Sequence, residues 1–193
     1  MLSRGPASTR TIEQQIQHQA FHDPLTDLPN RLLLMTRLAR SLTGGGKGFA
    51  VLFIDLDGFK EVNDLLGHRA GDRILINASA RMRNELRTND FLARLGGDEF
   101  VAILWDVPTP EGAEDVGRRI IGSLKAPFSD APTSVNLAAS VGIAIAVPGV
   151  DTPDGVLHRA DGAMYDAKRS GKGRVRTASA DEARRELADL LTG

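Results

Sequence analysis

Four acidic residues stand where the sequence predicts a β-hairpin and the end of a buried strand. Asp98 and Glu99 follow a glycine pair that separates two apolar runs, a pattern typical of a tight β-hairpin. Asp55 and Asp57 lie at the end of the apolar run 51–54, which predicts a buried strand. Carboxylate oxygens are ligands that Mg²⁺ prefers, particularly where substrate phosphates supply the remaining ligands. Together the two pairs indicate a metal site for phosphate chemistry.

The glycine pair itself has a chemical use. Gly96 and Gly97 carry no side chains, so a phosphate or a nucleoside can approach their backbone amides. A glycine pair followed by two acids is equally consistent with a solvated hairpin tip. Asp55 and Asp57 favour the metal site, because two-metal enzymes place a carboxylate on a central strand opposite the acids of a neighbouring hairpin.

Helices and strands must hold these acids in place, and the apolar periodicity predicts both. Apolar residues three or four apart indicate four amphipathic helices. These residues are Leu34, Leu38 and Leu42; Leu75, Ala78, Met82 and Leu86; Val116, Ile120 and Leu124; and Leu157, Ala160, Met164 and Ala167. Residues 135–147 predict one or two further strands. Helices alternate with strands without a strict βαβ rhythm, which predicts an α/β sandwich of a central sheet covered by helices.

The composition excludes several classes of protein. The 193 residues are 41% hydrophobic, enough for one core, and the net charge of −1 predicts no surface for nucleic acid or membrane. The absence of cysteine excludes thiolate catalysis, cysteine zinc sites and disulfides. No apolar stretch reaches the roughly 20 residues that span a bilayer, and no signal-peptide pattern opens the chain. We therefore expect a cytoplasmic domain with no membrane insertion and no nucleic-acid partner.

Six segments of the chain resemble, in order, the motifs of the GGDEF family of diguanylate cyclases. They are residues 23–31, 55–64, 67–72, 94–100, 140–143 and 161–168. The resemblance covers residues 23–174, nearly the whole chain. It implies an α+β fold of the nucleotide-cyclase or polymerase-palm type, in which helices flank a mostly antiparallel sheet of about five strands.

The resemblance implies that the protein condenses two GTP molecules into cyclic di-GMP and releases two pyrophosphates. In each step a ribose 3′-hydroxyl attacks an α-phosphate, with two Mg²⁺ or Mn²⁺ ions in each half-site. The expected metal ligands are Asp55, Asp98 and the backbone carbonyl of Leu56, followed by Glu99. Either Asp98 or Glu99 is expected to help deprotonate the hydroxyl, and the sequence leaves open which of them binds metal. Asp57 is expected to contact the metal ligands rather than the metal itself.

Further residues of these motifs are expected to bind GTP. The resemblance implies that Asn63 and Asp72 recognise guanine, and the chemistry agrees, since a carboxylate accepts hydrogen bonds from N1 and the exocyclic amine. A helix N-cap is the simpler role for Asp72, and the two roles are compatible. Lys60 is expected beside Asn63, over the site.

Two lysines near the end of the chain are expected to bind the terminal phosphates. Lys168 belongs to the last predicted helix, on one face with Asp161 and Tyr165, and it is also a candidate catalytic residue. Lys172 follows in the next turn. The chain departs from the family here, because Lys172 stands where arginine is common and Gly173 where asparagine is common. Lysine lacks the bidentate fork of arginine, so the expected phosphate affinity is lower.

An Arg-x-x-Asp pattern precedes the glycine pair. The resemblance implies that Arg87 and Asp90 form a site at which cyclic di-GMP inhibits the enzyme, with Arg118 or Arg119 as a second arginine. An exposed ion pair is the simpler interpretation of Arg87 and Asp90. A two-fold symmetric product made from two identical nucleotides indicates that two domains face each other, so we expect an active homodimer.

The two ends of the chain are expected to be linkers around a cyclase domain at residues 23–177. Residues 1–22 form a leader and a short helix of the kind that follows an upstream sensory domain in the resembling family. Residues 178–193 resemble a helix that leads into an EAL phosphodiesterase domain. The alternative function is therefore a catalytically weak domain that binds GTP or cyclic di-GMP and regulates a neighbour. A nucleic-acid polymerase palm is not supported, because the chain has no basic groove.

Overall fold

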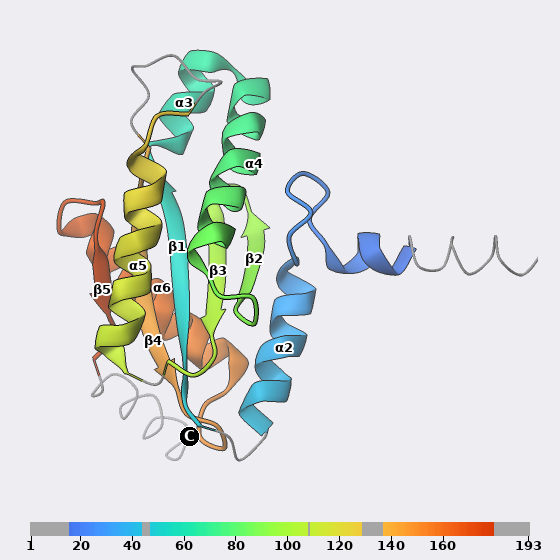
Figure 1. The fold of residues 1–193 in the computed structure, drawn as a ribbon, viewed down its shortest axis with the longest axis vertical. Coiled ribbons are helices and arrows are strands. Elements are labelled where there is room, and N and C mark those ends of the chain that lie inside the picture. Colours follow the sequence, from blue (N-terminus) through green and yellow to red (C-terminus); the bar gives the residue numbers. More distant parts are fainter. Residues whose placement is uncertain (1–15, 44–46, 108, 129–136, 180–193) are drawn as a thin grey trace, which may run out of the picture.

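A five-stranded sheet with helices on both faces forms the domain (Figure 1). The structure is a computed structural model, and it describes residues 16–43, 47–107, 109–128 and 137–179. The strands are β1 (Phe49–Asp57), β2 (Phe91–Gly96), β3 (Glu99–Leu104), β4 (Ala138–Ala146) and β5 (Val175–Thr177). The helices are α2 (Arg31–Thr43), α3 (Phe59–Leu66), α4 (His68–Glu85), α5 (Pro110–Lys125) and α6 (Pro153–Arg169).

The strand order is β2-β3-β1-β4-β5, which places β1 at the centre of the sheet. β1 pairs antiparallel with β3 and β4, β2 pairs antiparallel with β3, and β5 runs parallel to β4. The expected mostly antiparallel sheet of about five strands is confirmed. The region predicted as one or two strands at residues 135–147 contains the single strand β4, and residues 135 and 136 lie outside the described part.

The apolar run of β1 follows from its central position. All nine residues of β1 are buried, because helices cover both faces of the sheet and successive side chains alternate between those faces. One set of β1 side chains packs with α3, α4 and α5, and the other packs with α2 and α6. The first set is Ala50, Leu52, Ile54 and Leu56, and the second is Phe49, Val51 and Phe53. By the same alternation, Asp55 and Asp57 point to the α2 and α6 side.

Helix α6 lies very close to the sheet at Gly142 of β4. A Cβ atom added at Gly142 would overlap the carbonyl oxygen of Ala160 and the amide nitrogen of Met164. Both are backbone atoms of α6, so a side chain at this position could be accommodated only by moving the helix. Glycine thus fixes the distance between β4 and α6, and α6 carries Lys168.

The ends of the chain are described only in part. Residues 16–21 are helical, and Asn30 caps α2 by accepting hydrogen bonds from the amides of Leu32 (3.0 Å) and Leu33 (3.2 Å). Of the two predicted end segments, 1–22 and 178–193, the structure describes residues 16–22 and 178–179. The rest of the predicted leader and of the predicted C-terminal helix lies outside the described residues. None of the described helices is long and apolar enough to cross a membrane.

Candidate functional site

The hairpin of β2 and β3 brings its two acids to the end of β1. The antiparallel register of β1 and β3 places Asp55 opposite Glu99. The amide nitrogen of Leu56 donates to the carbonyl oxygen of Asp98, at 3.2 Å. The predicted glycine turn is present, with Gly96 ending β2 and Glu99 opening β3. The adjacent acids Asp98 and Glu99 therefore lie at the end of β1 beside Asp55, which is far from them in sequence.

Lys168 reaches this edge from α6. Its Nζ lies 2.7 Å from Oδ2 of Asp55, whose side chain is only 8% exposed, while the lysine side chain is 32% exposed. The lysine expected to bind phosphates thus lies beside the acids expected to bind metal. An ammonium group that is partly open to solvent can interact with an incoming phosphate as well as with Asp55.

Negative charge is in excess at this edge. Burial raises the pKa of Asp55 above its ordinary value, the hydrogen bond from Lys168 opposes this effect, and repulsion by Asp98 adds to it. Burial also raises the pKa of Glu99, with further repulsion from Asp55, Asp161 and Asp98. A cation bound among these carboxylates would relieve both the desolvation and the repulsion.

The oxygen donors at this end of β1 are of the type that a divalent cation prefers. Within the described residues, no three His, Cys, Asp or Glu side chains are grouped as a preformed metal site requires. Mg²⁺ is usually held by one or two carboxylates together with waters and substrate phosphates rather than by an all-protein cage. The carboxylates of Asp55 and Asp98 and the carbonyl of Leu56 are donors of this kind.

Asp57 has a structural role that its spacing does not reveal. Its carboxylate accepts hydrogen bonds from Ser140 Oγ, at 3.0 and 2.9 Å, and from the amide of Gly173, at 2.9 Å. It therefore ties β1 to β4 and to the turn after α6. Gly173 has a φ of 58°, a left-handed conformation that glycine and asparagine adopt most readily, which explains why glycine can replace the usual asparagine. Lys172 precedes it as an exposed residue, also with a φ of 58°.

Asn63 of α3 lies against Gly71 of α4, the residue before Asp72. A Cβ atom added at Gly71 would overlap Oδ1 of Asn63, so the Asn63 amide lies directly against the Gly71 backbone. Asp72 is the next residue and is exposed. The alternative role of Asp72 as an N-cap is wrong, because α4 begins at His68 with Gly67 as its N-cap. Lys60 is exposed on α3.

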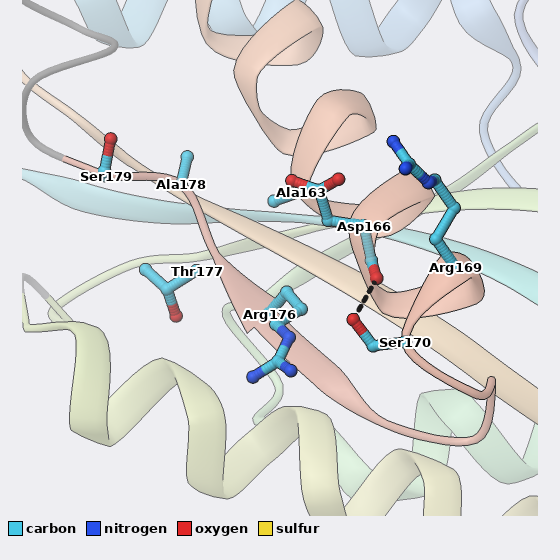
Figure 2. A pocket seen from close by; sticks show the side chains of 8 residues that line it. All are labelled: Ala163, Asp166, Arg169, Ser170, Arg176, Thr177, Ala178 and Ser179. Atoms are coloured by element: carbon cyan, nitrogen blue, oxygen red, sulfur yellow. Dashed lines mark hydrogen bonds between the residues drawn. The ribbon is translucent and has the colours of Figure 1, made fainter.

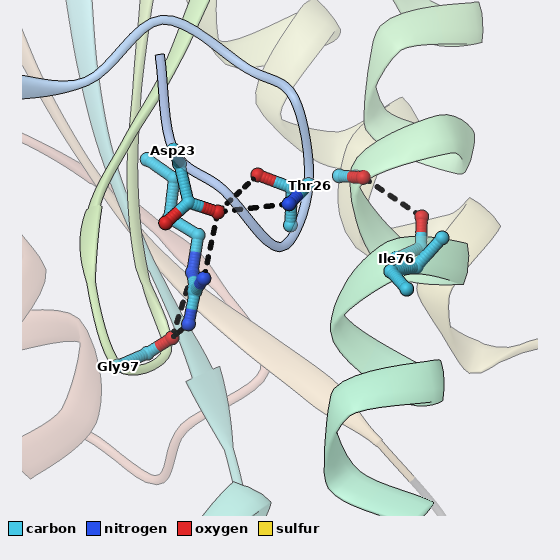
Figure 3. A network of polar contacts seen from close by, with 6 residues as sticks. Asp23, Thr26, Ile76 and Gly97 are labelled. Carbon is cyan, nitrogen blue, oxygen red and sulfur yellow. Dashed lines mark hydrogen bonds and ion pairs between the residues drawn. The ribbon is translucent and has the colours of Figure 1, made fainter. Parts of the chain in front are cut away.

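Arg94 and Asp23 fix the position of the hairpin turn. Figure 3 labels Asp23, Thr26 and Gly97 of this network. Arg94 Nη1 lies 2.8 Å from Oδ1 of Asp23, and its Nε and Nη2 donate to the carbonyl oxygen of Gly97, at 3.1 and 2.7 Å. The same Asp23 oxygen accepts hydrogen bonds from the amide (2.9 Å) and hydroxyl (2.7 Å) of Thr26. Sequence reasoning missed this pair. The available signal was a charged residue inside an otherwise apolar strand, since a buried charge requires a partner.

Hydrogen bonds from Asp90 and from Arg83 of α4 fix the backbone of the loop that contains Arg87 and Asp90. Asp90 is buried, and its Oδ2 accepts a hydrogen bond from the amide of Arg87, at 2.9 Å. Arg83 of α4 donates to the carbonyl oxygens of Asp90 (2.6 Å) and Thr88 (3.1 Å). The simpler interpretation of Arg87 and Asp90 as an exposed ion pair is wrong, because Asp90 is 7% exposed and bonds to backbone. Arg87 is exposed at the surface of the loop.

The adjacent residues Arg118 and Arg119 of α5 have different hydrogen-bond and ion-pair partners. Arg119 Nη2 donates to the carbonyl oxygen of Glu85 at 2.9 Å, and its Nε lies 3.4 Å from a Glu85 carboxylate oxygen. Glu85 ends α4 just before the loop of Arg87, so Arg119 lies beside that loop. Arg118 instead pairs with Glu114 (3.2 Å) and Asp115 (2.7 Å) on its own helix. Arg119 is therefore the better placed of the two candidates.

Two cavities lie on the α6 side of the sheet. The larger, of about 520 Å³, lies between the end of α6 and β5, and its wall includes none of the acids of the hairpin edge. Its two arginines, Arg169 and Arg176, extend in different directions (Figure 2). The smaller, of about 370 Å³, is lined by Glu99 together with residues of α2 and α6. The larger cavity is thus separate from the predicted chemistry, whereas the smaller adjoins it.

Comparison with known proteins agrees with this geometry. A family model described as diguanylate cyclase, GGDEF domain, matches residues 20–174. Diguanylate cyclase TpbB of Pseudomonas aeruginosa is 45% identical over 174 residues, which are 88% of this chain and 40% of TpbB. The bifunctional diguanylate cyclase/cyclic di-GMP phosphodiesterase MucR of the same species is 41% identical over 168 residues, or 86% of this chain and 24% of MucR. The chain spans less than half the length of these relatives.

Solved structures give the same result. The GGDEF domain of TpbB superimposes with a TM-score of 0.77 at 45% identity, covering 86% of this chain and 98% of that one. The coiled coil and GGDEF domain of DgcB from Caulobacter crescentus, in complex with c-di-GMP, superimposes with a TM-score of 0.80 at 27% identity, covering 89% and 93%. With the family model matching most of its length, the chain belongs to the GGDEF family of diguanylate cyclase domains.

Proposed function

We propose that the protein is a diguanylate cyclase that converts two GTP molecules into cyclic di-GMP and two pyrophosphates. The observation that carries the proposal is the meeting of Asp55, Asp98 and Glu99 at one edge of the sheet, with Lys168 beside them. A degenerate domain would not need to retain this costly group of buried and partly buried charges. Family membership supports the same activity.

The reaction forms one phosphodiester bond in each half-site. The 3′-oxygen of one GTP bonds to the α-phosphorus of the other, and the bond from that phosphorus to the bridging oxygen of the β-phosphate breaks. Pyrophosphate leaves, and Glu99 or Asp98 accepts the hydroxyl proton. Two Mg²⁺ or Mn²⁺ ions held by Asp55, Asp98, Glu99 and the Leu56 carbonyl would supply charge neutralisation and a lowered hydroxyl pKa. Lys168 stabilises negative charge on the departing pyrophosphate.

Guanine selectivity is assigned to Asn63 and Asp72. The Asp72 carboxylate accepts from N1 and the exocyclic amine, and adenine cannot offer this pair of donors. The contact of Asn63 with Gly71 supports the pairing, because it holds the amide next to Asp72. The backbone of Gly96 and Gly97 can approach the nucleotide, while Lys60 and Lys172 are exposed and free to meet its phosphates.

Two copies of the domain are proposed to supply the two half-sites. The product is two-fold symmetric, so two domains facing each other, each with one GTP, form it with the fewest rearrangements. Cyclic di-GMP is proposed to inhibit at the loop of Arg87 and Asp90, with Arg119 completing the site. A homologous domain, that of DgcB, was solved in complex with c-di-GMP, which supports binding of this ligand by the fold.

Chromatography of the nucleotides after incubation with GTP and Mg²⁺ tests the activity. The protein should make cyclic di-GMP, Asp98→Ala should reduce the rate at least 100-fold, and Glu111→Ala, an exposed change on α5, should not alter it. Clear binding of GTP or cyclic di-GMP with no turnover at any protein concentration would favour the alternative, a weak GGDEF domain that regulates an adjoining domain. Residues 23–177 are proposed as the cyclase domain in either case.

A further inference from the structure

The cavity of about 370 Å³ adjoins the catalytic hairpin on the side of α2 and α6. Glu99 contributes to its wall from β3, Phe53 from β1, Arg31 from the first turn of α2 and Asp161 from α6. With Leu95 of β2, the cavity is bounded by five elements, and Glu99 is one of the two acids expected to accept the hydroxyl proton. Its volume is sufficient for a sugar ring with one phosphate.

The guanine site assigned above lies on the opposite side of the sheet. Asn63 packs against Gly71, and α3 and α4 belong to the core that contains Leu52 and Ile54. Phe53, which lines the cavity, belongs to the other core, with α2 and α6. The base of the nucleotide bound by this chain and the cavity are thus separated by the sheet, with the hairpin between them.

Two carboxylates in the cavity have acceptor capacity to spare. Asp161 and Glu99 both line it, and they are close enough for the charge of Asp161 to act on Glu99. No hydrogen bond or ion pair joins either carboxylate to another residue in the described part of the chain. The 2′- and 3′-hydroxyls of a ribose are adjacent donors, and carboxylates recognise such diols in nucleotide-binding proteins.

We propose that this cavity receives the ribose of the attacking GTP, the nucleotide bound by the partner copy, and that Asp161 accepts a hydrogen bond from its 2′-hydroxyl. The adjacent 3′-hydroxyl then lies at Glu99, from which its oxygen attacks the α-phosphate. Arg31 provides positive charge for the sugar's phosphate in an otherwise acidic cavity. The inference rests on the proposed cyclase activity and gives Asp161 a substrate-positioning role within it.

The test compares GTP with 2′-deoxy-GTP as substrates of the whole chain and of Asp161→Ala. Loss of one hydrogen bond to a charged acceptor corresponds to a rate change of about tenfold or more. The wild-type protein should prefer GTP in kcat/KM by at least that factor, and Asp161→Ala should bring the preference close to one by slowing GTP alone. Binding of a non-reactive GTP analogue should stay within twofold, since the guanine of the chain's own nucleotide is assigned to Asn63 and Asp72, across the sheet from Asp161.

Asp166→Ala is the matched control, because Asp166 is exposed on the same helix and lines the other cavity. It should keep the wild-type preference. An Asp161→Ala variant that slows both substrates equally, or that weakens binding of the analogue, would overturn the inference while leaving the cyclase proposal intact. A wild-type protein without preference for the 2′-hydroxyl would also overturn it. Failure of the wild-type protein to make cyclic di-GMP would instead reject both proposals.

Discussion

Arg94 is a charged residue in the interior of the domain, with a side chain only 9% exposed. Its guanidinium joins Asp23, near the start of the described chain, to the carbonyl oxygen of Gly97 in the hairpin turn. A buried guanidinium left without these acceptors would be strongly destabilising. The position of the hairpin turn therefore depends on a residue 71 positions away from Arg94 in sequence.

The Asp23–Arg94 pair predicts a pH-dependent loss of stability. Burial raises the pKa of Asp23, but hydrogen bonds from Thr26 and Arg94 outweigh it and the net pKa is lowered. Stability from a carboxylate with a lowered pKa is present above its unfolded-state pKa and disappears as the pH falls through the folded-state value. Asp23→Asn should lower the free energy of unfolding by about 1–2 kcal/mol at pH 7 and by less at a pH below the ordinary aspartate pKa of 3.8. Urea titrations at both pH values measure this, and a pH-independent difference would contradict it.

Gly71 offers a second test at the residue scale. Alanine in a helix is ordinarily more stable than glycine by about 1 kcal/mol, but here its methyl group would displace the amide of Asn63. Gly71→Ala should weaken GTP binding about tenfold, the loss expected for one displaced hydrogen-bonding group. Calorimetric titration with a non-reactive GTP analogue measures the effect. Gly122→Ala on α5, where no atom lies within 4 Å, is the control and should bind as the wild type does.

Residue types and spacing predicted the acids of the site but not every partner. Asp55 and Glu99 were foreseen because each stands at an interruption of an apolar run. The tie from Asp57 to Ser140 and Gly173 was not, because hydrogen bonds between distant segments leave no periodic signal. The choice between Arg118 and Arg119 also needed the structure, since adjacent helical residues differ by about 100° in direction and the sequence does not say which faces α4.

At the scale of elements, α4 and its following loop form one unit. Arg83, on the last turns of α4, bonds to two carbonyl oxygens of the loop that contains Arg87 and Asp90. Asp90 closes the same loop through its own carboxylate. The loop thus has a defined backbone conformation before any ligand arrives, and pre-organisation of this kind raises affinity by reducing the entropy lost on binding.

Arg83→Ala should therefore weaken feedback inhibition without changing basal turnover. The half-inhibitory concentration of cyclic di-GMP should rise about tenfold, and Arg83→Lys should restore inhibition only in part because lysine lacks a planar fork. Turnover at low product concentration and the melting temperature report any general damage. If Arg87→Ala relieves inhibition and Arg83→Ala does not, the loop does not depend on Arg83. If neither does, the inhibitory site lies elsewhere.

Element types were largely predictable, and their pairing was not. The helices followed from apolar spacing, and β1 followed from its density of apolar residues. The parallel pairing of β5 with β4 had no counterpart in the periodicity, because β5 has three residues and lies at the edge of the sheet. A strand this short lacks the alternation on which sequence-based prediction depends.

At the scale of the whole molecule, one domain is proposed to carry one half-site, so that turnover needs two copies. Specific activity should therefore fall as the protein is diluted, approaching proportionality to concentration once monomers predominate. Initial rates over a dilution series, with the mass measured at each concentration by light scattering, test this expectation. Constant specific activity down to concentrations at which only monomer remains would show that a single copy completes the reaction.

The close approach at Gly142 links the interior of the domain to its chemistry. Lys168 and Asp161 reach their places only because α6 lies almost against β4, and no side chain fits between them. A survey of all single substitutions, scored for turnover, should therefore group Gly142 with the carboxylates of the hairpin although glycine has no functional group. A position that such a survey identifies as essential for activity can therefore act through the distance between two backbones, without a side chain that takes part in the reaction.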